Sequence, residues 1–443
     1  MSFSKHPEYK DSGVEWLGQV PNHWHIRKGR WLFEIKKRIV GELGFDVLSI
    51  TQKGIRVKDT ESNDGQLSMD YSKYQLVEIG DFAMNHMDLL TGYVDLSPII
   101  GVTSPDYRVF TIKDAKSCHP KFFLCLLQNG YLNKIFYPYG QGSSQLGRWR
   151  MPTEQFKDFS YPFPPIDEQK KIVTFISVET AKIDILVAEQ EKLIELLKER
   201  RQAVISHAVT KGLDPTVKMK NSGVEWLEEV PEHWDVKKLK FLVDVMASNV
   251  DKKSYEGEIS CSLCNYTDVY YNENICQDME FMSATATAEQ VVKFTLKKDD
   301  VVITKDSESP NDIGIAAYVP FDLDGVVCGY HLSIVRPHSI NGMFVKRLFD
   351  SNYLKSKFAV LANGLTRYGL GQYSINNVYI PIPPELDQLK IINLINKTCL
   401  GIDDLIDKSK DSINLLLERR SALISEAVTG QIDVRNYKLK EAA

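Results

Sequence analysis

The sequence predicts an α+β protein built as an internal repeat, with two mixed α/β domains and two long helices. The segment 11–28, DSGVEWLGQVPNHWHIRK, returns at 221–238 as NSGVEWLEEVPEHWDVKK, with 11 of 18 residues identical. The segment 199–210, ERRQAVISHAVT, returns at 418–429 as ERRSALISEAVT, with 9 of 12 identical. Offsets of 210 and 219 residues are too long for a solenoid unit, so they indicate two copies of a whole domain.

The composition is that of an ordinary globular protein, with 43% hydrophobic and 26% charged residues among 443. No apolar run reaches the roughly 18 residues of a membrane span, and the first residues lack the apolar core of a signal peptide. Seven cysteines, an odd number, fit reduced thiols, so we expect a cytoplasmic protein. The net charge of -5 argues against a protein that coats nucleic acid regardless of its sequence, although it averages over any local basic face.

The first domain begins with the Trp motif (residues 11–28), whose Trp16 and Trp24 are expected to pack in a core. Short β-like runs follow at 46–51, 74–78, 82–84 and 107–112. Residues 120–129 have helical spacing, and Asn129-Gly130 is predicted to end that helix. The segment 137–150, YPYGQGSSQLGRWR, is predicted to be an exposed loop.

A long helix is predicted over residues 167–209, because no proline or glycine occurs between Pro165 and Gly212 and apolar residues recur every three to four positions. It would span about 64 Å, so it needs a partner, and the second copy supplies one after Pro383-Pro384. The repeated pairs Arg200-Arg201 and Arg419-Arg420 could hydrogen-bond helix-end carbonyls or partner carboxylates, but a solvated face is the preferred expectation. The residues expected to pair the helices are Ile183, Leu186, Leu193, Leu197, Val204, Ile402, Leu405, Leu416 and Leu423, with Gln190 and Ser409 as polar positions among them.

The sequence lacks the motifs of several enzyme classes. No P-loop is present to hold ATP phosphates, and no Asn-Pro-Pro-aromatic or Asp-Pro-Pro-aromatic run is present to hold a base for methylation. Cys261, Cys264, Cys328 and His331 have spacings that would suit zinc, but they occur in strand-like segments and the first copy has no equivalent. Buried thiols are therefore the preferred interpretation, and we expect no catalytic residue and no metal site.

The repeated Gly-Val-Glu-Trp-Leu…Val-Pro-x-His-Trp block and the PPIDEQKKI segment at 164–172 resemble the specificity subunit of type I restriction–modification systems. The blocks LCNYTDVY (263–270), TKDSE (304–308) and CGYHL (328–332) in the second copy share this resemblance. The second helix departs from the pattern in one place, opening with 383–388, PPELDQ, in place of Glu-Gln. The resemblance implies two α/β target-recognition domains separated by two long antiparallel helices that form a coiled coil, with pseudo-twofold symmetry.

On this basis the expected domains are a first target-recognition domain (1–160), a central helix (161–213), a second target-recognition domain (214–378), and a C-terminal helix and tail (379–443). The family implies a non-catalytic chain that reads an asymmetric bipartite target in double-stranded DNA. Its partners are two modification subunits, which use S-adenosylmethionine to methylate adenine, and restriction subunits, which use ATP and Mg²⁺. The chain itself is expected to bind no cofactor.

DNA contacts are expected from polar and basic side chains on loops, because phosphates attract Lys and Arg while base edges pair with Arg, Asn, Gln and Ser. An equally simple alternative is that Arg148 and Arg367 only fix their loops to the domain. The candidate residues are Lys53, Arg56, Tyr139, Gln141, Ser143, Ser144, Arg148 and Arg150 in the first copy, and Lys305, Ser307, Arg367, Tyr368 and Gln372 in the second.

Two other classes of protein stay open at this point. A coiled-coil structural adaptor would also contain long helices, but it would not need two divergent α/β domains. A stand-alone DNA-modifying enzyme would need a cofactor or metal constellation that the sequence does not display. The DNA target, and the length of the gap within it, cannot be read from the sequence.

Overall fold

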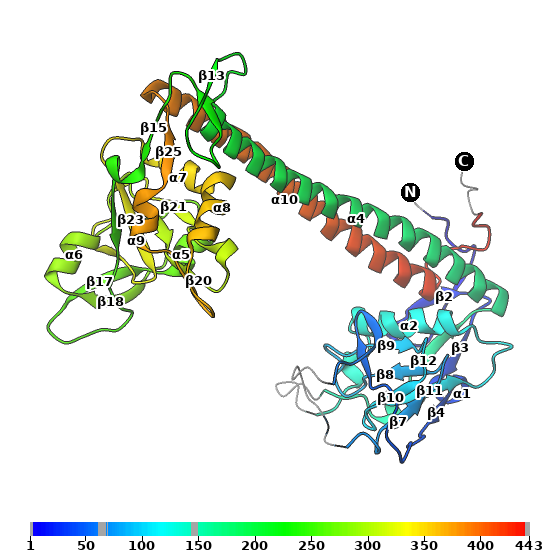
Figure 1. The fold of residues 1–443 in the computed structure, drawn as a ribbon. Coiled ribbons are helices and arrows are strands. Elements are labelled where there is room, and N and C mark those ends of the chain that lie inside the picture. The colour runs from blue at the N-terminus through cyan, green and yellow to red at the C-terminus, as the bar shows by residue number, and fades with distance from the viewer. Residues whose placement is uncertain (1–2, 61–67, 69, 143–148, 439–443) are drawn as a thin grey trace. The chain divides into compact units, whose positions relative to one another are not determined.

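The computed structural model describes residues 3–60, 68, 70–142 and 149–438 (Figure 1). The chain forms two compact units, residues 1–190 with 411–443 and residues 191–410. Each unit contains one α/β module and one end of each long helix. The long helices are α4 (Ile166–Lys211) and α10 (Glu385–Thr429).

A small frame of paired strands surrounds each copy of the Trp motif. The frame strands are β1 (Tyr9–Asp11) with β2 (Gln19–Pro21) and β3 (His25–Lys28) with β12 (Ser160–Phe163) in the first unit, and β13 (Met219–Asn221) with β14 (Glu229–Pro231) and β15 (Asp235–Lys238) with β25 (Tyr379–Ile382) in the second. Lys28 pairs with Ser160 as Lys238 pairs with Tyr379, so the two frames have the same register. Residues 29–159 (the first module) and 239–378 (the second module) therefore enter and leave their frames at equivalent points.

Each module is centred on a four-stranded antiparallel sheet with the same strand order. The order is β4 (Phe33–Lys36), β11 (Arg108–Ile112), β8 (Phe82–Met84), β9 (Val94–Leu96) in the first module, and β16 (Val243–Ala247), β23 (Leu332–Pro337), β19 (Val301–Thr304), β21 (Ala316–Tyr318) in the second. The predicted mixed α/β repeat is confirmed, although the modules resemble one another only in outline in sequence. The shared order reflects matching patterns of buried apolar strands rather than identical residues.

Smaller elements surround these sheets. The remaining strands are β5 (Leu48–Thr51), β6 (Gly54–Val57), β7 (Gln75–Val77) and β10 (Gly101–Thr103) in the first module, and β17 (Ile259–Cys264), β18 (Met282–Ala286), β20 (Asp306–Ser307), β22 (Val326–Cys328) and β24 (Tyr368–Gly369) in the second. The short helices are α1 (Gly29–Leu32), α2 (Pro120–Leu132), η1 (Tyr137–Tyr139), α3 (Thr153–Asp158), η3 (Leu239–Phe241), α5 (Tyr266–Tyr270), α6 (Ala288–Phe294), η4 (Pro310–Asp312), α7 (Gly342–Asp350), α8 (Asn352–Leu361) and α9 (Gln372–Asn377).

Helix α2 continues past the predicted stop at Asn129-Gly130. Gly130 lies inside the helix, where a β-carbon would come within 2.3 Å of the Phe136 ring. The residue with left-handed backbone is Lys134, at φ 55°, after the helix has ended. The prediction was wrong because Gly130 allows close packing of an aromatic ring and does not form a turn.

The Trp motif packs in the core, as predicted. Trp24 and Trp234 are 0% and 1% exposed, and each lies in the core cluster that joins its frame to the long helices. Trp16 stacks on Phe159 with ring centroids 5.5 Å apart. Its counterpart Trp226 is 40% exposed, so the second tryptophan of the motif is the anchor in both copies.

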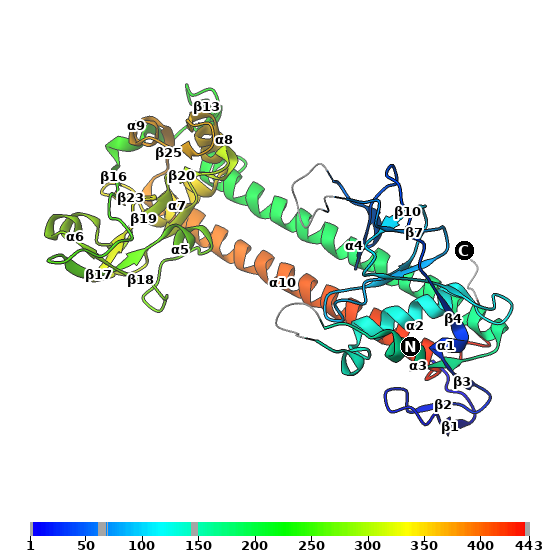
Figure 2. The same ribbon diagram turned by 90° about the horizontal axis from the view of Figure 1, so that it is seen from below.

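Helices α4 and α10 lie side by side and run antiparallel, as both views show (Figures 1 and 2). In the first unit, residues near the start of α4 such as Phe175 pack with Leu423 and Val428 near the end of α10. In the second unit, Val209 near the end of α4 packs with Ile395 near the start of α10.

Two ion pairs between the helices repeat with the offset of 219 residues. Arg201 Nε lies 3.4 Å from Asp403 in the second unit, and Arg420 Nε lies 3.0 Å from Asp184 in the first. The preferred expectation of a solvated face was wrong for Arg201 and Arg420, and the alternative of partner carboxylates holds for both, because each pairs with an aspartate on the facing helix.

The residues through which the helices face each other, here called the seam, follow the predicted spacing in part. The predicted residues Ile183, Leu197, Ile402 and Leu423 are buried, and Val204 and Leu416 are half-buried. In contrast, Leu186, Leu193 and Leu405 are 45%, 42% and 49% exposed, and Ile194 and Ile406 are buried in place of Leu193 and Leu405. For these three leucines the predicted register was wrong by one residue. The sequence does not distinguish the two registers, because the residue after each leucine is also apolar.

None of the helices in the described part of the chain combines the length and apolarity that crossing a membrane requires.

Candidate nucleic-acid interface

In the second module, segments far apart in sequence meet beside the strand pair β20–β24. A carboxylate oxygen of Asp306 lies 2.8 Å from His331 Nδ1 and accepts a hydrogen bond of 2.7 Å from the Arg367 guanidinium. His331 is buried, whereas the Arg367 side chain is 54% exposed. The cluster therefore has a fixed inner end and an outer end, the Arg367 guanidinium, which retains donors for another molecule.

Aromatic side chains border this cluster. Tyr266 and Tyr270 stack with centroids 5.5 Å apart, and the Tyr330 ring lies 3.6 Å from the His331 ring. The Tyr270 hydroxyl donates to Asp312 at 2.7 Å, and this hydrogen bond raises the pKa of Tyr270 to about 12. Burial raises the pKa of Tyr266. Both phenols therefore stay neutral donors at neutral pH.

The three blocks that carried the family resemblance in the second copy thus converge on one place. The sequence pointed to the blocks, but not to Asp306, His331 or Tyr266 as members of one cluster. No local signal could have found the cluster, because Asp306 and Arg367 are 61 residues apart.

The other predicted DNA-contact residues of the second module differ in their burial and in their hydrogen-bond partners. The Lys305 ammonium donates to the Ser248 carbonyl at 2.7 Å, and burial lowers its pKa. The Gln372 amide donates to the Val245 carbonyl at 2.6 Å, and Ser307 is buried. Tyr368 is half-buried in β24. Lys305, Ser307, Arg367 and Tyr368 come together, while Gln372 lies at the start of α9 and is bonded to β16.

Both modules fix the segment before α3 or α9 in the same way. Gln141 and Arg150 exchange two backbone hydrogen bonds of 2.8 and 3.0 Å, and Asn363 and Gly369 do the same at 3.0 and 2.8 Å. The next residue then donates its N–H to the segment after the central strand, Met151 to His86 at 2.9 Å and Leu370 to Lys305 at 2.7 Å. The backbone pairs Gln141–Arg150 and Asn363–Gly369 therefore occupy equivalent points of the two modules.

The predicted contact residues of the first module are described only in part. Gln141 and Arg150 are exposed, and Tyr139 is half-buried with its ring edge-on to Phe159 at 5.1 Å. Lys53 and Arg56 are exposed on the β5–β6 hairpin. Three further predicted residues, Ser143, Ser144 and Arg148, lie outside the described residues.

The cysteines considered for zinc lie in the apolar core of the second module. Cys264 and Cys328 are neighbours in the parallel pair β17–β22, and Cys261 is buried on β17. Burial raises the pKa of the Cys264 and Cys328 thiols, which favours the protonated form over the thiolate that zinc requires. His331 interacts with Asp306 and Arg367, so these residues fit buried thiols and a separate histidine cluster.

A family model described as "Type I restriction modification DNA specificity domain" matches the chain twice, over residues 31–196 and 231–415. A similar curated protein is the putative type I restriction enzyme MjaX specificity subunit of Methanocaldococcus jannaschii. It is 21% identical over 459 residues, which cover 98% of this chain and 99% of that protein.

Two solved structures share the fold. A chain from work on complex assembly and conformational transition of the type I R-M system has a TM-score of 0.67 at 14% identity, covering 93% of this chain and 99% of that one. The HsdS subunit from Thermoanaerobacter tengcongensis has a TM-score of 0.53 at 14% identity, covering 93% and 98%. The family matches span the greater part of both modules and of both long helices, and the chain belongs to the family of type I restriction–modification DNA specificity domains.

Proposed function

We propose that this chain is the specificity subunit of a type I restriction–modification complex and reads an asymmetric bipartite DNA target, one half with each module. The observation that carries the proposal is the repetition of one fold in frames of equal register, with different residues in sequence between the equivalent backbone pairs Gln141–Arg150 and Asn363–Gly369. Equal frames present both modules to DNA in the same manner, and different segments read different bases.

In this proposal α4 and α10 form an antiparallel coiled coil that separates the two halves of the target by a fixed gap. A helix of 46 residues spans about 69 Å, which is about two turns of B-form DNA. The pairs Arg201–Asp403 and Arg420–Asp184 support this role, because they bind the helices to each other at symmetry-related positions. A stiff spacer makes the gap between the half-sites a constant of the complex.

The proposed protein partners are two modification subunits, together with restriction subunits. Leu186 and Leu405 are 45% and 49% exposed, and Leu196 and Leu415 are 51% and 65% exposed. The members of each pair are related by the offset of 219 residues, so the repeat offers the same apolar side chains twice. Two identical subunits would find two equivalent docking surfaces on one chain.

The chemistry in this proposal belongs to the partners. The modification subunits bind S-adenosylmethionine and methylate adenine, and the restriction subunits use ATP and Mg²⁺. This chain binds none of these cofactors and supplies the choice of sequence.

Reconstitution tests the proposal. The chain is co-expressed with the modification subunit of the proposed complex, and methylation of the host DNA is mapped. We expect methylation at one bipartite motif when both proteins are present, and none when either is omitted. Methyl transfer or cleavage by the isolated chain would make it an enzyme in its own right, and a complex that methylates DNA identically without this chain would make it a structural adaptor.

Replacing Arg367 by alanine is expected to weaken binding of the assembled complex to its target by about 10- to 100-fold, since a bidentate contact to a base is worth about 1–3 kcal/mol. The loss should relax the choice of base in one half-site and leave the other half unchanged. Arg367→Lys keeps the charge but not the planar fork, so it should retain affinity for unrelated DNA and still lose the discrimination.

The measurement is a titration of each variant against the target and against targets changed at single positions. Thermal unfolding of the same samples provides the control. If Arg367→Ala lowers the melting temperature while the preference for bases in both half-sites persists, Arg367 only fixes its loop to Asp306.

A further inference from the structure

Four segments of the first unit meet around the side chain of His6. His6 belongs to the N-terminal segment, His23 to the Trp motif, Glu168 to the first turn of α4, and Asp433 to the tail after α10. His6 Nε2 lies 3.7 Å from Glu168 Oε1, and His23 Nε2 lies 2.7 Å from Glu168 Oε2. His6 Nδ1 lies 3.8 Å from Asp433 Oδ2.

Two buried polar atoms of this group of side chains have no hydrogen-bond partner among the described residues. They are His6 Nδ1 and Glu168 Oε1, on side chains that are 1% and 5% exposed. Buried polar atoms are normally paired, and an unpaired one costs free energy. The unpaired Glu168 oxygen faces His6 Nε2 at 3.7 Å and indicates a missing ligand between them, whereas the nearest acceptor for His6 Nδ1 is the Asp433 carboxylate at 3.8 Å.

The donors suit a borderline-soft divalent cation. One ligand atom from each of His6, His23 and Glu168 lies within 4.8 Å of the others. In a tetrahedral zinc site with bonds of about 2.0–2.1 Å, donor atoms are about 3.4 Å apart, so shifts of about 1 Å suffice.

We propose that His6, His23 and Glu168 bind one divalent metal ion of the zinc class. His6 would coordinate through Nε2, and the Asp433 carboxylate would accept a hydrogen bond from its Nδ1–H on the opposite side of the ring. A carboxylate behind a coordinating imidazole is a common second contact at such sites, where it orients the ring. Asp433 is itself held by Arg435 through hydrogen bonds of 2.7 and 2.9 Å. A recess of about 230 Å³ lined by Pro7, Glu8, Asn22, His23 and Arg435 gives access to a water as fourth ligand.

The ion would join the N-terminal segment and the Trp motif to the first turn of α4, and Asp433 would link the tail after α10 to the same site. The two terminal segments already touch there, since the Asp433 N–H donates to the Ser4 carbonyl at 2.7 Å and Lys171 donates to the Arg435 carbonyl at 2.8 Å. A single ion joining residues 6, 23 and 168 adds a crosslink that the unfolded chain lacks. Binding of zinc therefore stabilises the first unit.

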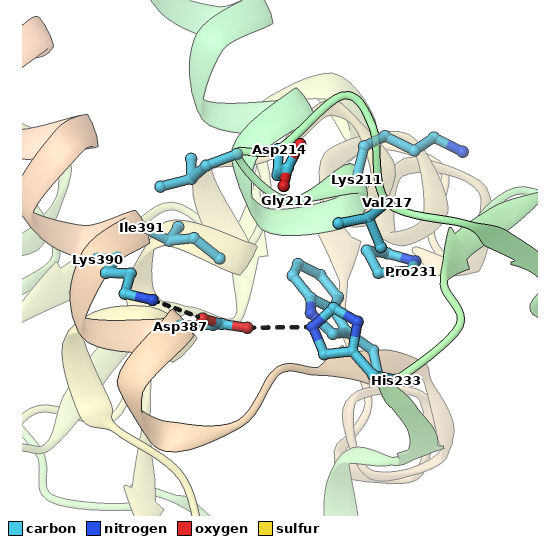
Figure 3. Close-up of a pocket in the computed structure, with 11 residues that line it drawn as sticks. Lys211, Gly212, Asp214, Val217, Pro231, His233, Asp387, Lys390 and Ile391 are labelled. Atoms are coloured by element: carbon cyan, nitrogen blue, oxygen red, sulfur yellow. Dashed lines mark hydrogen bonds and ion pairs between the residues drawn. The ribbon is translucent and has the colours of Figure 1, made fainter.

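The second repeat contains a histidine and a carboxylate at the positions of His23 and Glu168, but it has no counterpart of the His6 imidazole. His233 Nε2 lies 3.1 Å from Asp387, at the positions of His23 and Glu168. Thr216 stands at the position of His6 in the repeat, and a pocket of about 280 Å³ is lined by His233, Trp234 and Asp387, the counterparts of His23, Trp24 and Glu168. Figure 3 shows His233 and Asp387 joined across this pocket, with Asp214 on another wall. The second repeat is thus a built-in control that should bind no metal.

The test uses the full-length chain, stripped with a chelator and titrated with Zn²⁺, and with Co²⁺ as a spectroscopic probe. We expect one equivalent of zinc at submicromolar dissociation constant, a rise in melting temperature, and visible Co²⁺ absorption of a tetrahedral site. His6→Gln should lose all three, whereas His233→Gln in the second repeat should keep them. Absence of saturable binding at 100 µM Zn²⁺, or equal binding by His6→Gln, would overturn the proposal.

A second variant covers the case in which His6→Gln does not fold. Asp433→Asn keeps all three ligands and removes only the charge behind His6, so it should weaken zinc binding by about 10- to 100-fold. An unchanged affinity in Asp433→Asn would overturn the proposed arrangement.

Discussion

Replacing Trp234 by alanine is expected to lower the free energy of unfolding by about 3–5 kcal/mol, the range found for buried tryptophan. Trp234 is 1% exposed and packs in one core with Val209 of α4, Val230 of β14 and Ile391 of α10. The packing is tight, since a β-carbon at Gly212 would lie 3.3 Å from the Trp234 ring. The substitution leaves a cavity where frame, module and both helices meet, and the close packing limits how far the site can collapse.

Trp226 supplies the matched control. It belongs to the same motif but is 40% exposed, and the Lys357 ammonium lies 4.9 Å from its ring centroid. Trp226→Ala should cost about 1 kcal/mol or less. Denaturant unfolding of the full chain, followed by circular dichroism, gives both values. Equal effects of the two substitutions would contradict the assignment of Trp234 as the anchor of the frame.

The sequence predicted the frame well because the repeated residues are the ones that the frame buries. Trp24 and Trp234 recur with their prolines, and the helix ends recur with Arg201 and Arg420, so each copy confirms the pattern in the other. Burial and cross-helix pairing impose the same demand on both copies. The two domains and both long helices could therefore be predicted from the repeats alone.

The register of the seam could not be fixed in the same way. Leu193 and Ile194 are both apolar, as are Leu405 and Ile406, and only the structure distinguishes the buried member of each pair. Pattern reasoning assumes that a helix has one apolar face. These helices have a second one, and the exposed leucines are explained if another protein covers it.

Lys305, Ser307, Arg367 and Tyr368 were predicted as site residues, but their partners Asp306 and His331 and the cluster around His6 were not, because these residues are brought together only by the fold. Glu168 is 145 residues from His23, and Arg367 is 36 residues from His331. Neither pair has a spacing that signals contact. The proposed DNA-contact segments differ in sequence between the modules, so comparison of the two copies, which identified the frame, carries no information about bases.

The central claim is that each module reads its own half of the target. The equal registers of β3–β12 and β15–β25 allow a direct test, because residues 29–159 fit between the same frame positions as residues 239–378. A chain carrying the first module in both places is expressed with the modification subunit in cells lacking the native chain. A chain rebuilt with its own second module through the same junctions is the control.

Methylation mapping of the host DNA is the measurement. We expect the rebuilt control to methylate the native asymmetric motif, and the duplicated chain to methylate a symmetric motif made of two copies of one native half-site. The other native half-site should disappear. Persistence of the native motif in cells with the duplicated chain, or loss of both native half-sites while methylation continues elsewhere, would contradict the account.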